Sequence, residues 1–201
     1  TRRSSDLYFV TALFLASERW DEPHYSDEAN KILAKVMNKN GIESGVYNLF
    51  DTDSRLVTFV PTRTGHGFTD PSYQLPAFID KWARTATANR PFWKKAATAA
   101  RQHLIASANP ITGLYPDYSQ FDGKAYAWPN ATYDTSLYMY DAIRCPMNVG
   151  MDYYLCGKDR RNQETVMGHL LAFFKKDGFK HGHFSLDGSR AFGQYSCGMA
   201  G

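Results

Sequence analysis

The sequence is poor in cysteine, and the few cysteines present are not spaced like metal ligands. Its 201 residues include 3 cysteines, at Cys145, Cys156 and Cys197. An odd number of cysteines without a ligand-type spacing argues against a disulfide framework and against a zinc site. We therefore expect free, buried thiols at these positions.

Net charge and long apolar runs are also lacking. The chain carries 23 Lys and Arg against 20 Asp and Glu, a formal charge of +3. This charge is too small and too scattered to predict a nucleic-acid partner. No apolar run approaches the roughly 18 residues of a membrane span, so no membrane association is expected. The sequence leaves the compartment open, with a secreted or periplasmic location favoured over a cytoplasmic one.

Aromatic side chains, in contrast, are abundant: they make up 15% of the chain, with 13 Tyr, 13 Phe and 4 Trp. Tyr and Trp combine an apolar face with a polar edge. This combination suits sugars, whose ring faces carry C–H groups and whose rims carry hydroxyls. For any single aromatic residue the core is the commoner place, and Trp82 and Trp93 are expected there.

Apolar periodicity predicts an all-α chain in a single domain over residues 1–201. Helices are expected at 7–20, from Ser26 through Val36, from Asp70-Pro71 through Trp82, and at 91–108, 134–156 and 162–176. Residues 196–201 resemble the start of a further helix. Residues 42–69, with room for a small hairpin, and 113–122 are predicted loops, and 179–193 a short hairpin. Helix pairs joined by long loops favour a toroid or solenoid of α-hairpins, and no fixed period supports ordinary solenoid repeats.

One pair of charged residues stands in a mostly apolar helical segment. Asp141 and Arg144 are three residues apart and therefore lie on one helical face. A carboxylate in such surroundings must be paired, and an arginine can orient it and keep it ionised. An oriented carboxylate beside a cleft can activate water. Taken alone, the same pattern is more often a salt bridge between helices.

Several motifs in order along the chain resemble glycoside hydrolase family 8, most closely its xylan-cleaving members. They are LYFVTALFLA (7–16), DPSYQLP (70–76), RPFWKKAA (90–97), TGLYPDY (112–118), FDG (121–123) and YDAIR (140–144), followed by Asn148 and Asp152. Together they cover nearly the whole chain. The resemblance implies an (α/α)6 barrel of twelve helices, of which about six to eight are present here, and inversion of the anomeric centre.

The resemblance also implies roles for individual residues. Asp141 matches the general base, Arg144 its orienting partner, and Tyr73 the tyrosine that helps to hold the attacking water. The family's general acid is a Glu in a segment that precedes these motifs, so no residue of this chain takes that role. A second acidic position, which binds the distorted sugar, falls on Ser4 in an ungapped match and on Asp6 if two residues are deleted.

The DPSY and RPFWKK motifs point to xylan as the substrate. Candidates for sugar contact are the loop aromatics Trp128, Tyr126, Tyr118 and Tyr115. The exo-acting members share a Leu-His-Pro loop, and the corresponding stretch here is Gln194-Tyr195-Ser196, so an open, endo-acting cleft is expected. No cofactor is implied. His181 and His183 are a poor metal site and are expected in a surface hairpin.

The alternatives differ in substrate or in class. The chain could act on another β-1,4 glycan as a glucanase or chitosanase. It could also be an inactive carbohydrate-binding remnant without the general acid, or a toroid that binds proteins. Six full helices are expected where the family has twelve, so the sequence is interpreted as an internal fragment or as one piece of a cleaved enzyme. Its partner would then be the missing part of its own barrel, which would cover apolar helix faces left exposed here.

Overall fold

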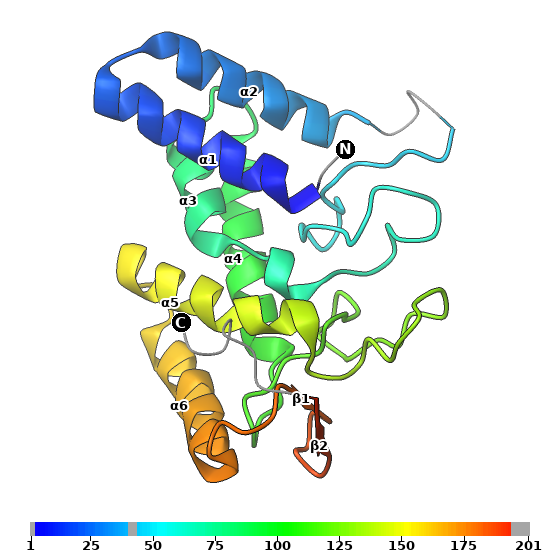
Figure 1. Cartoon of the computed structure of the whole chain (residues 1–201). Coiled ribbons are helices and arrows are strands. Elements are labelled where there is room, and N and C mark those ends of the chain that lie inside the picture. The colour runs from blue at the N-terminus through cyan, green and yellow to red at the C-terminus, as the bar shows by residue number, and fades with distance from the viewer. Residues whose placement is uncertain (1–2, 40–43, 194–201) are drawn as a thin grey trace.

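The computed structural model describes residues 3–39 and 44–193, and six α-helices in this part of the chain form three helical hairpins (Figure 1). The first pairs α1 (Arg3–Trp20) with α2 (Pro23–Met37), the second α3 (Pro76–Thr85) with α4 (Arg90–Ala106), and the third α5 (Cys145–Leu155) with α6 (Arg160–Asp177). α3 contacts α1 on one side and α5 on the other. The second hairpin therefore lies between the other two.

The buried face of each helix follows the apolar periodicity. In α1, Leu7, Val10 and Phe14 are almost fully buried, and they recur at the three- and four-residue spacing of one helical face. Trp82 in α3 and Trp93 in α4 are 0% and 1% exposed, and their rings meet edge to face at 5.5 Å. The prediction that these two tryptophans belong to the core is confirmed.

Two predicted helices start later in the chain than expected, and in both a proline lies in the first turn of the helix that forms. Asp70 begins only a 3-10 turn, η1 (Pro71–Tyr73), because Pro76 disfavours helical backbone at the preceding Leu75, and the helix restarts as α3. Residues 134–139 are not helical. Tyr140–Arg144 forms a second 3-10 turn, η2, before α5 begins with a proline in its first turn.

The start of α2 also differs from the prediction. The helix begins at Pro23, with Glu22 as its N-cap, three residues before the predicted start at Ser26. The Ser26 hydroxyl instead donates to the carbonyl of Pro23 inside the first turn. Proline at the first helical position is favourable because its missing N–H has no helical partner there.

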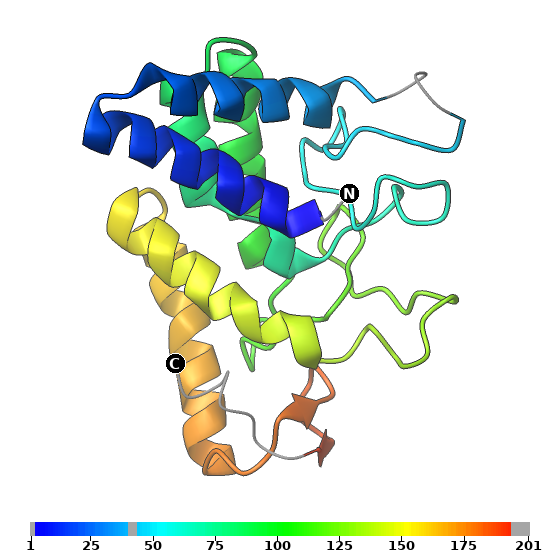
Figure 2. The same ribbon diagram turned by 45° about the horizontal axis from the view of Figure 1, so that its top comes forward.

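Two long loops gather on one side of the helices, where both turns also lie (Figures 1 and 2). The loop before η1 contains two isolated antiparallel bridges, Val46 with Thr62 and Phe50 with Val57, where a small hairpin was expected. The loop after α4 joins it through Thr69 and Ser119, whose backbones exchange hydrogen bonds of 3.0 and 2.9 Å. These bonds place the two loops side by side.

The chain continues after α6 into a short hairpin of β1 (His183–Phe184) and β2 (Ala191–Phe192), with His183 opposite Phe192. The predicted hairpin at 179–193 is therefore confirmed. Cys145 is buried and Cys156 partly buried, and both thiols are free, as predicted. Cys197, the stretch Gln194-Tyr195-Ser196 and the helix start expected at 196–201 lie outside the described residues.

Apolar side chains remain exposed on several helices. Large examples are Phe9, Leu15 and Trp20 of α1, Met147, Tyr154 and Leu155 of α5, and Leu171 of α6. A groove of about 880 Å³ runs between α5 and α6 and is lined mainly by apolar residues, among them Ile143, Met167 and Phe179. None of the helices within 3–39 and 44–193 is long and apolar enough to cross a membrane.

Candidate active site

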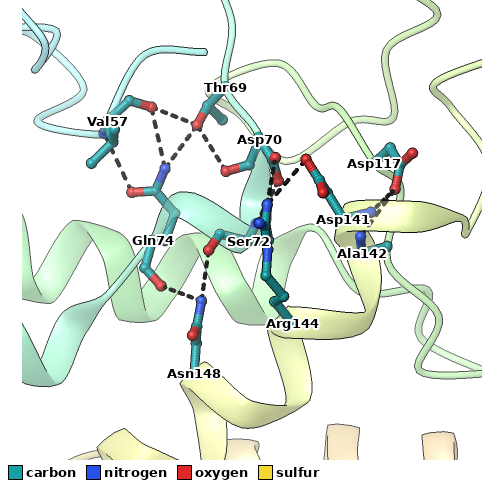
Figure 3. A network of polar contacts seen from close by, with 10 residues as sticks. All are labelled: Val57, Thr69, Asp70, Ser72, Gln74, Asp117, Asp141, Ala142, Arg144 and Asn148. Carbon is teal, nitrogen blue, oxygen red and sulfur yellow. Dashed lines mark hydrogen bonds and ion pairs between the residues drawn. The ribbon is translucent and has the colours of Figure 1, made fainter. Parts of the chain in front are cut away.

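The guanidinium of Arg144 lies at the centre of a polar network between η1 and η2 (Figure 3). Its Nη2 is 3.0 Å from Asp141 Oδ2 and 3.5 Å from Asp70 Oδ2. Its Nε and Nη2 also donate to Ser72 Oγ at 3.2 and 2.7 Å. The guanidinium carbon lies 5.6 Å from the centre of the Tyr73 ring. One arginine thus links two carboxylates and contacts the tyrosine that the resemblance singled out.

Asp141 and Arg144 share one face even though their segment is not an α-helix. In a 3-10 turn, residues three apart in sequence are eclipsed along the axis. The tighter turn therefore brings the two side chains together as the α-helical spacing would have done. The predicted contact between Asp141 and Arg144 is present, at the start of α5 and not within a longer helix.

The two carboxylates beside Arg144 differ in their access to solvent. The side chain of Asp141 is 38% exposed, whereas that of Asp70 is 0% exposed. Burial and the nearby Asp141 charge raise the pKa of Asp70 well above its usual value. Asp70 Oδ1 accepts the Ser72 N–H at 2.7 Å. Asp141 is therefore the carboxylate that water can reach, and Asp70 holds the turn.

Side chains from three segments fix η1 in place. Asn148 of α5 donates through Nδ2 to the carbonyls of Ser72 and Gln74, at 2.8 and 3.1 Å. Gln74 Nε2 donates to Thr69 Oγ1 at 2.7 Å, and Thr69 Oγ1 donates to the carbonyl of Val57 at 2.5 Å. The turn that carries Tyr73 is thus tied to α5 and to the first loop at once.

A third aspartate lies on the far side of Asp141. Asp117 is fully buried, and its Oδ1 accepts the N–H groups of Asp141 and Ala142 at 3.1 and 3.0 Å. Burial raises its pKa to about 6, and the Asp141 charge adds to this. The N–H of Ala142 and the hydroxyl of Tyr133 act in the opposite direction. Asp117 contacts the backbone of η2, while Arg144 contacts the side chain of Asp141 (Figure 3).

The loop aromatics pack together near the two turns. Phe59 and Phe68 form their centre, with Tyr118 at 4.2 Å from Phe59 and Tyr126 at 4.8 Å from Phe68. Trp128 lies 5.3 Å from Phe59, and both Trp128 and Tyr126 remain partly exposed. These two rings have surface available for a sugar, whereas Tyr118, at 8% exposed, has little.

Tyr115 does not fit the role predicted for it. Its side chain is 0% exposed and lies in the core cluster formed by the end of α4, α5, α6 and the hairpin. A fully buried ring offers no surface to a sugar, so the expectation of sugar contact at Tyr115 is wrong. The loop-like sequence around it concealed that Tyr115 anchors the loop to the core.

Asp6 lies in the first turn of α1 and is partly buried. Two residues further on, burial raises the pKa of Tyr8 while the positive charge of Arg144 lowers it. This influence places the beginning of α1 within electrostatic range of Arg144. The side chain of Ser4, the competing position for the second acidic residue, lies outside what the structure describes.

Sequence reasoning assigned no site role to four residues of the network: Asp70, Ser72, Asp117 and Asn148. All four fall within or directly after the quoted motifs, so a signal was present. Asp70 is predicted only as the start of a helix, and in the structure its side chain caps η1. Contacts such as that between Asp117 and η2 join residues 24 positions apart, and no local pattern reveals them.

Helical hairpins that carry a carboxylate–arginine network beside their loops are the arrangement that the resemblance to glycoside hydrolases implies. The family model of glycosyl hydrolases family 8 matches residues 3–180, and the chain belongs to this family. It is 32% identical over 187 residues to the reducing end xylose-releasing exo-oligoxylanase of Halalkalibacterium halodurans, a match covering 90% of this chain and 46% of that protein. It is 35% identical over 173 residues to the reducing-end xylose-releasing exo-oligoxylanase Rex8A of Paenibacillus barcinonensis, covering 83% and 44%.

Among solved structures, a catalytic mutant of a family 8 xylanase from Teredinibacter turnerae in complex with xylohexaose is similar, with a TM-score of 0.84 at 34% identity. The match covers 96% of this chain and 52% of that one. The chain therefore spans about half the length of the relatives it matches. These likenesses confirm the predicted fold, a partial (α/α)6 barrel, and the predicted resemblance to xylan-cleaving members of the family.

Proposed function

We propose that this chain supplies the general-base half of an inverting glycoside hydrolase that cleaves β-1,4-linked xylan or xylo-oligosaccharides. The observation that carries the proposal is the Asp141 carboxylate. This carboxylate is accessible to water and lies 3.0 Å from the Arg144 guanidinium. The same guanidinium lies over the ring of Tyr73. A base needs this combination of fixed orientation and solvent access.

The proposed reaction uses two carboxyl groups. Asp141 accepts a proton from a water molecule, whose oxygen attacks the anomeric carbon from the face opposite the leaving sugar. The glycosidic C–O bond breaks as a carboxylic acid protonates the leaving oxygen. The two groups stand roughly 6.5–9.5 Å apart in inverting enzymes, which leaves room for the water. The resemblance assigns the acid to a Glu outside this chain.

The supporting residues of the proposal follow the same geometry. Arg144 orients the Asp141 carboxylate through the 3.0 Å ion pair. Tyr73 is proposed to help hold the water, and Asp6 is retained as the candidate that binds the distorted sugar. Trp128 and Tyr126 provide partly exposed rings for sugar stacking. Xylo-oligosaccharides are the favoured substrate because the relatives named above are described as acting on xylo-oligosaccharides or were solved with xylohexaose.

The groove between α5 and α6 is the place at which we propose that the rest of the barrel packs. Its lining is mainly apolar and includes Arg144, and the relatives that match this chain are about twice its length. Burial of such a surface is favourable at roughly 25 cal/mol per Å². The missing part of the barrel would thus be the first partner of this chain, and the complete protein is the proper subject of every assay.

The configuration of the first product tests the proposal. Xylohexaose digested by the complete protein in an NMR tube should release new reducing ends as the α-anomer, before mutarotation produces the β-anomer. Initial release of the β-anomer would contradict inversion. Cello-oligosaccharides and chitosan oligomers in parallel assays test the alternative substrates, and binding of xylohexaose without hydrolysis would identify an inactive remnant.

The mode of cleavage is tested separately with reduced xylohexaose. The expectation of an endo-acting cleft depends on residues 194–196, and the two relatives described above are exo-acting. An endo-acting enzyme cleaves internal bonds of the reduced substrate and yields xylobiose and xylotriose early. An enzyme that requires a free reducing end leaves the reduced substrate intact, which would contradict the endo expectation.

A further inference from the structure

Asp117 occupies an unusual position for a buried carboxylate. Its side chain is 0% exposed, yet it forms no ion pair with an arginine or lysine among the described residues. Its Oδ1 accepts two backbone N–H groups, those of Asp141 and Ala142. Burying a carboxylate without a cation is costly. We therefore attribute the position of Asp117 to the hydrogen bonds that it accepts from these two N–H groups and from the Tyr133 hydroxyl.

The turn that Asp117 contacts has no cap of its own. Met139 precedes η2 as its N-cap residue and provides no side-chain hydrogen bond. The first N–H groups of a helical turn have no partner within the turn. Asp117 fills this role from a loop residue 24 positions earlier in the sequence. Figure 3 shows its carboxylate on the side of Asp141 away from Arg144.

The loop that carries Asp117 is itself held firmly. The N–H of Asp117 donates to the carbonyl of Leu137 at 2.9 Å, and that of Tyr118 to Thr135 at 2.8 Å. Ser119, two residues on, exchanges hydrogen bonds with Thr69, which directly precedes Asp70. Asp117 is thus fixed relative to the segment of η1 that holds Arg144.

We propose that Asp117 is a positioning residue, which sets the placement of the Asp141 carboxylate by holding the backbone N–H groups of η2. This inference rests on the proposed function, in which Asp141 is the general base. Because Asp141 and Arg144 both belong to the five-residue turn Tyr140–Arg144, a shift of its backbone moves both side chains. A displacement of about 1 Å in a catalytic group can lower the rate about 100-fold.

The role requires an acceptor oxygen and does not require a charge. The carbonyl oxygen of an asparagine can accept the same two N–H groups as the carboxylate. Alanine provides no acceptor and leaves both groups unsatisfied in a buried site. A comparison of Asp117→Asn with Asp117→Ala therefore tests whether the acceptor oxygen of residue 117 positions η2.

The test compares kcat and KM on xylohexaose for these variants in the complete protein, with circular dichroism melting to establish folding. Asp117→Ala should lower kcat about 100-fold with KM within about threefold, while Asp117→Asn should stay within about fivefold of the unaltered protein. Asp187→Ala is the matched control. Asp187 also caps a backbone N–H, that of Ser189 at 3.0 Å, but in the exposed hairpin turn, and its loss should leave kcat unchanged.

A folded Asp117→Ala variant with kcat within threefold of the unaltered protein would overturn the inference, as would an Asp117→Asn variant as impaired as Asp117→Ala. If Asp117→Ala does not fold, Asp117→Glu takes its place, because one added methylene displaces the acceptor; an unchanged kcat there would also overturn it. Failure of the proposed function has a different signature: either no hydrolysis by the unaltered protein or full activity of Asp141→Asn.

Discussion

Two of the aspartate–arginine pairs among the described residues, Arg101 with Asp152 and Arg144 with Asp141, differ in how far they are exposed to solvent. Arg101 and Asp152 join α4 to α5, with both guanidinium nitrogens Nε and Nη2 at 2.5 Å from the carboxylate oxygens. Gln163 of α6 donates to the same carboxylate at 2.7 Å. The side chains of Arg101 and Asp152 are 7% and 0% exposed. This pair is saturated with hydrogen bonds and closed to water.

The pair of Arg144 with Asp141 is open. Both side chains are more than a third exposed, at 37% and 38%, and the guanidinium is shared with the buried Asp70 and with Ser72. Among the residues that the structure describes, the Asp141 side chain pairs with Arg144, and its backbone N–H donates to Asp117. Its carboxylate therefore keeps lone pairs available for a water molecule.

The difference shows how a structural and a catalytic charged pair can be told apart. A structural pair satisfies both partners and excludes solvent, since an unsatisfied buried charge would be costly. A catalytic pair orients one partner and leaves it reachable. Asp141 and Arg144 have the second arrangement, and Arg101 and Asp152 the first. Substitutions at the two pairs and at their neighbours test this contrast.

Breaking the closed pair should affect stability and leave the chemistry alone. Asp152→Asn removes the charge that neutralises the buried Arg101, which should lower the free energy of unfolding by about 3–5 kcal/mol. Urea unfolding of the complete protein measures this, and kcat of the folded variant should stay within threefold. The double variant Arg101→Met with Asp152→Leu should be more stable than Asp152→Asn. An unchanged unfolding midpoint in Asp152→Asn would show that the pair is not structural.

Altering the open pair should affect the rate. Arg144→Lys retains the positive charge but loses the fork that reaches Ser72, Asp70 and Asp141 together. We expect kcat on xylohexaose to fall about 100-fold through misplacement of the base. Arg84→Lys is the matched control, since Arg84 pairs with Asp80 while 61% exposed. A kcat within threefold for Arg144→Lys would mean that charge alone orients Asp141.

The buried carboxylate behind the base should give stability a pH dependence. Burial raises the pKa of Asp117 to about 6 in the folded protein, against about 3.9 in an unfolded chain. Between these values the folded state binds more protons, so stability decreases as pH rises from about 4 to 6. The contribution is roughly 2 kcal/mol at about 1.4 kcal/mol per pKa unit, discounted for screening.

Asp117→Asn should remove this contribution to the pH dependence of stability. The raised pKa of Asp70 adds a pH dependence of the same sign in both proteins. The difference between the variant and the unaltered protein therefore reports Asp117 alone. Urea unfolding at pH 4, 5, 6 and 7 measures the effect. Identical pH slopes in the two proteins would contradict a raised pKa at Asp117.

The hydroxyl of Ser72 should have a smaller effect on the rate. Ser72→Ala removes two hydrogen bonds to the Arg144 guanidinium but keeps the backbone N–H that Asp70 caps. Hydrogen bonds to charged groups contribute about 1.5–3 kcal/mol, and partial compensation by the two carboxylates should limit the loss of kcat to about tenfold. Ser136→Ala, which loses only a bond to Asp134, is the control. Equal kcat in both variants would remove Ser72 from the orienting network.

Periodicity and motif resemblance predicted much of the fold. The buried stripe of α1, the core positions of Trp82 and Trp93 and the final hairpin followed from local patterns, because burial on one face leaves a regular trace in sequence. The boundaries at Pro76 and before Cys145 were missed. A proline inside an expected helix signals a break in that helix. The helix predicted from Asp70-Pro71 contains such a proline at Pro76, and the prediction did not take it into account.

The candidate site was only partly predictable for a different reason. Asp141 and Arg144 are neighbours in sequence, so their contact follows from turn geometry. The contacts of Asp117 with η2 and of Asn148 with η1 join segments 24 to 76 positions apart. Such contacts depend on how the two loops and α5 come together. The same limit explains Tyr115, whose loop-like surroundings gave no sign that its ring enters the core.

Substitution of Asp141 by asparagine in the complete protein tests most directly whether this carboxylate is the general base. The variant keeps the shape of the side chain but cannot accept the proton from water. We predict that kcat on xylohexaose falls about 100- to 10,000-fold, while the free energy of unfolding changes by no more than about 0.5 kcal/mol because the side chain is partly exposed. A stable Asp141→Asn protein with kcat within tenfold of the unaltered enzyme would show that the base lies elsewhere.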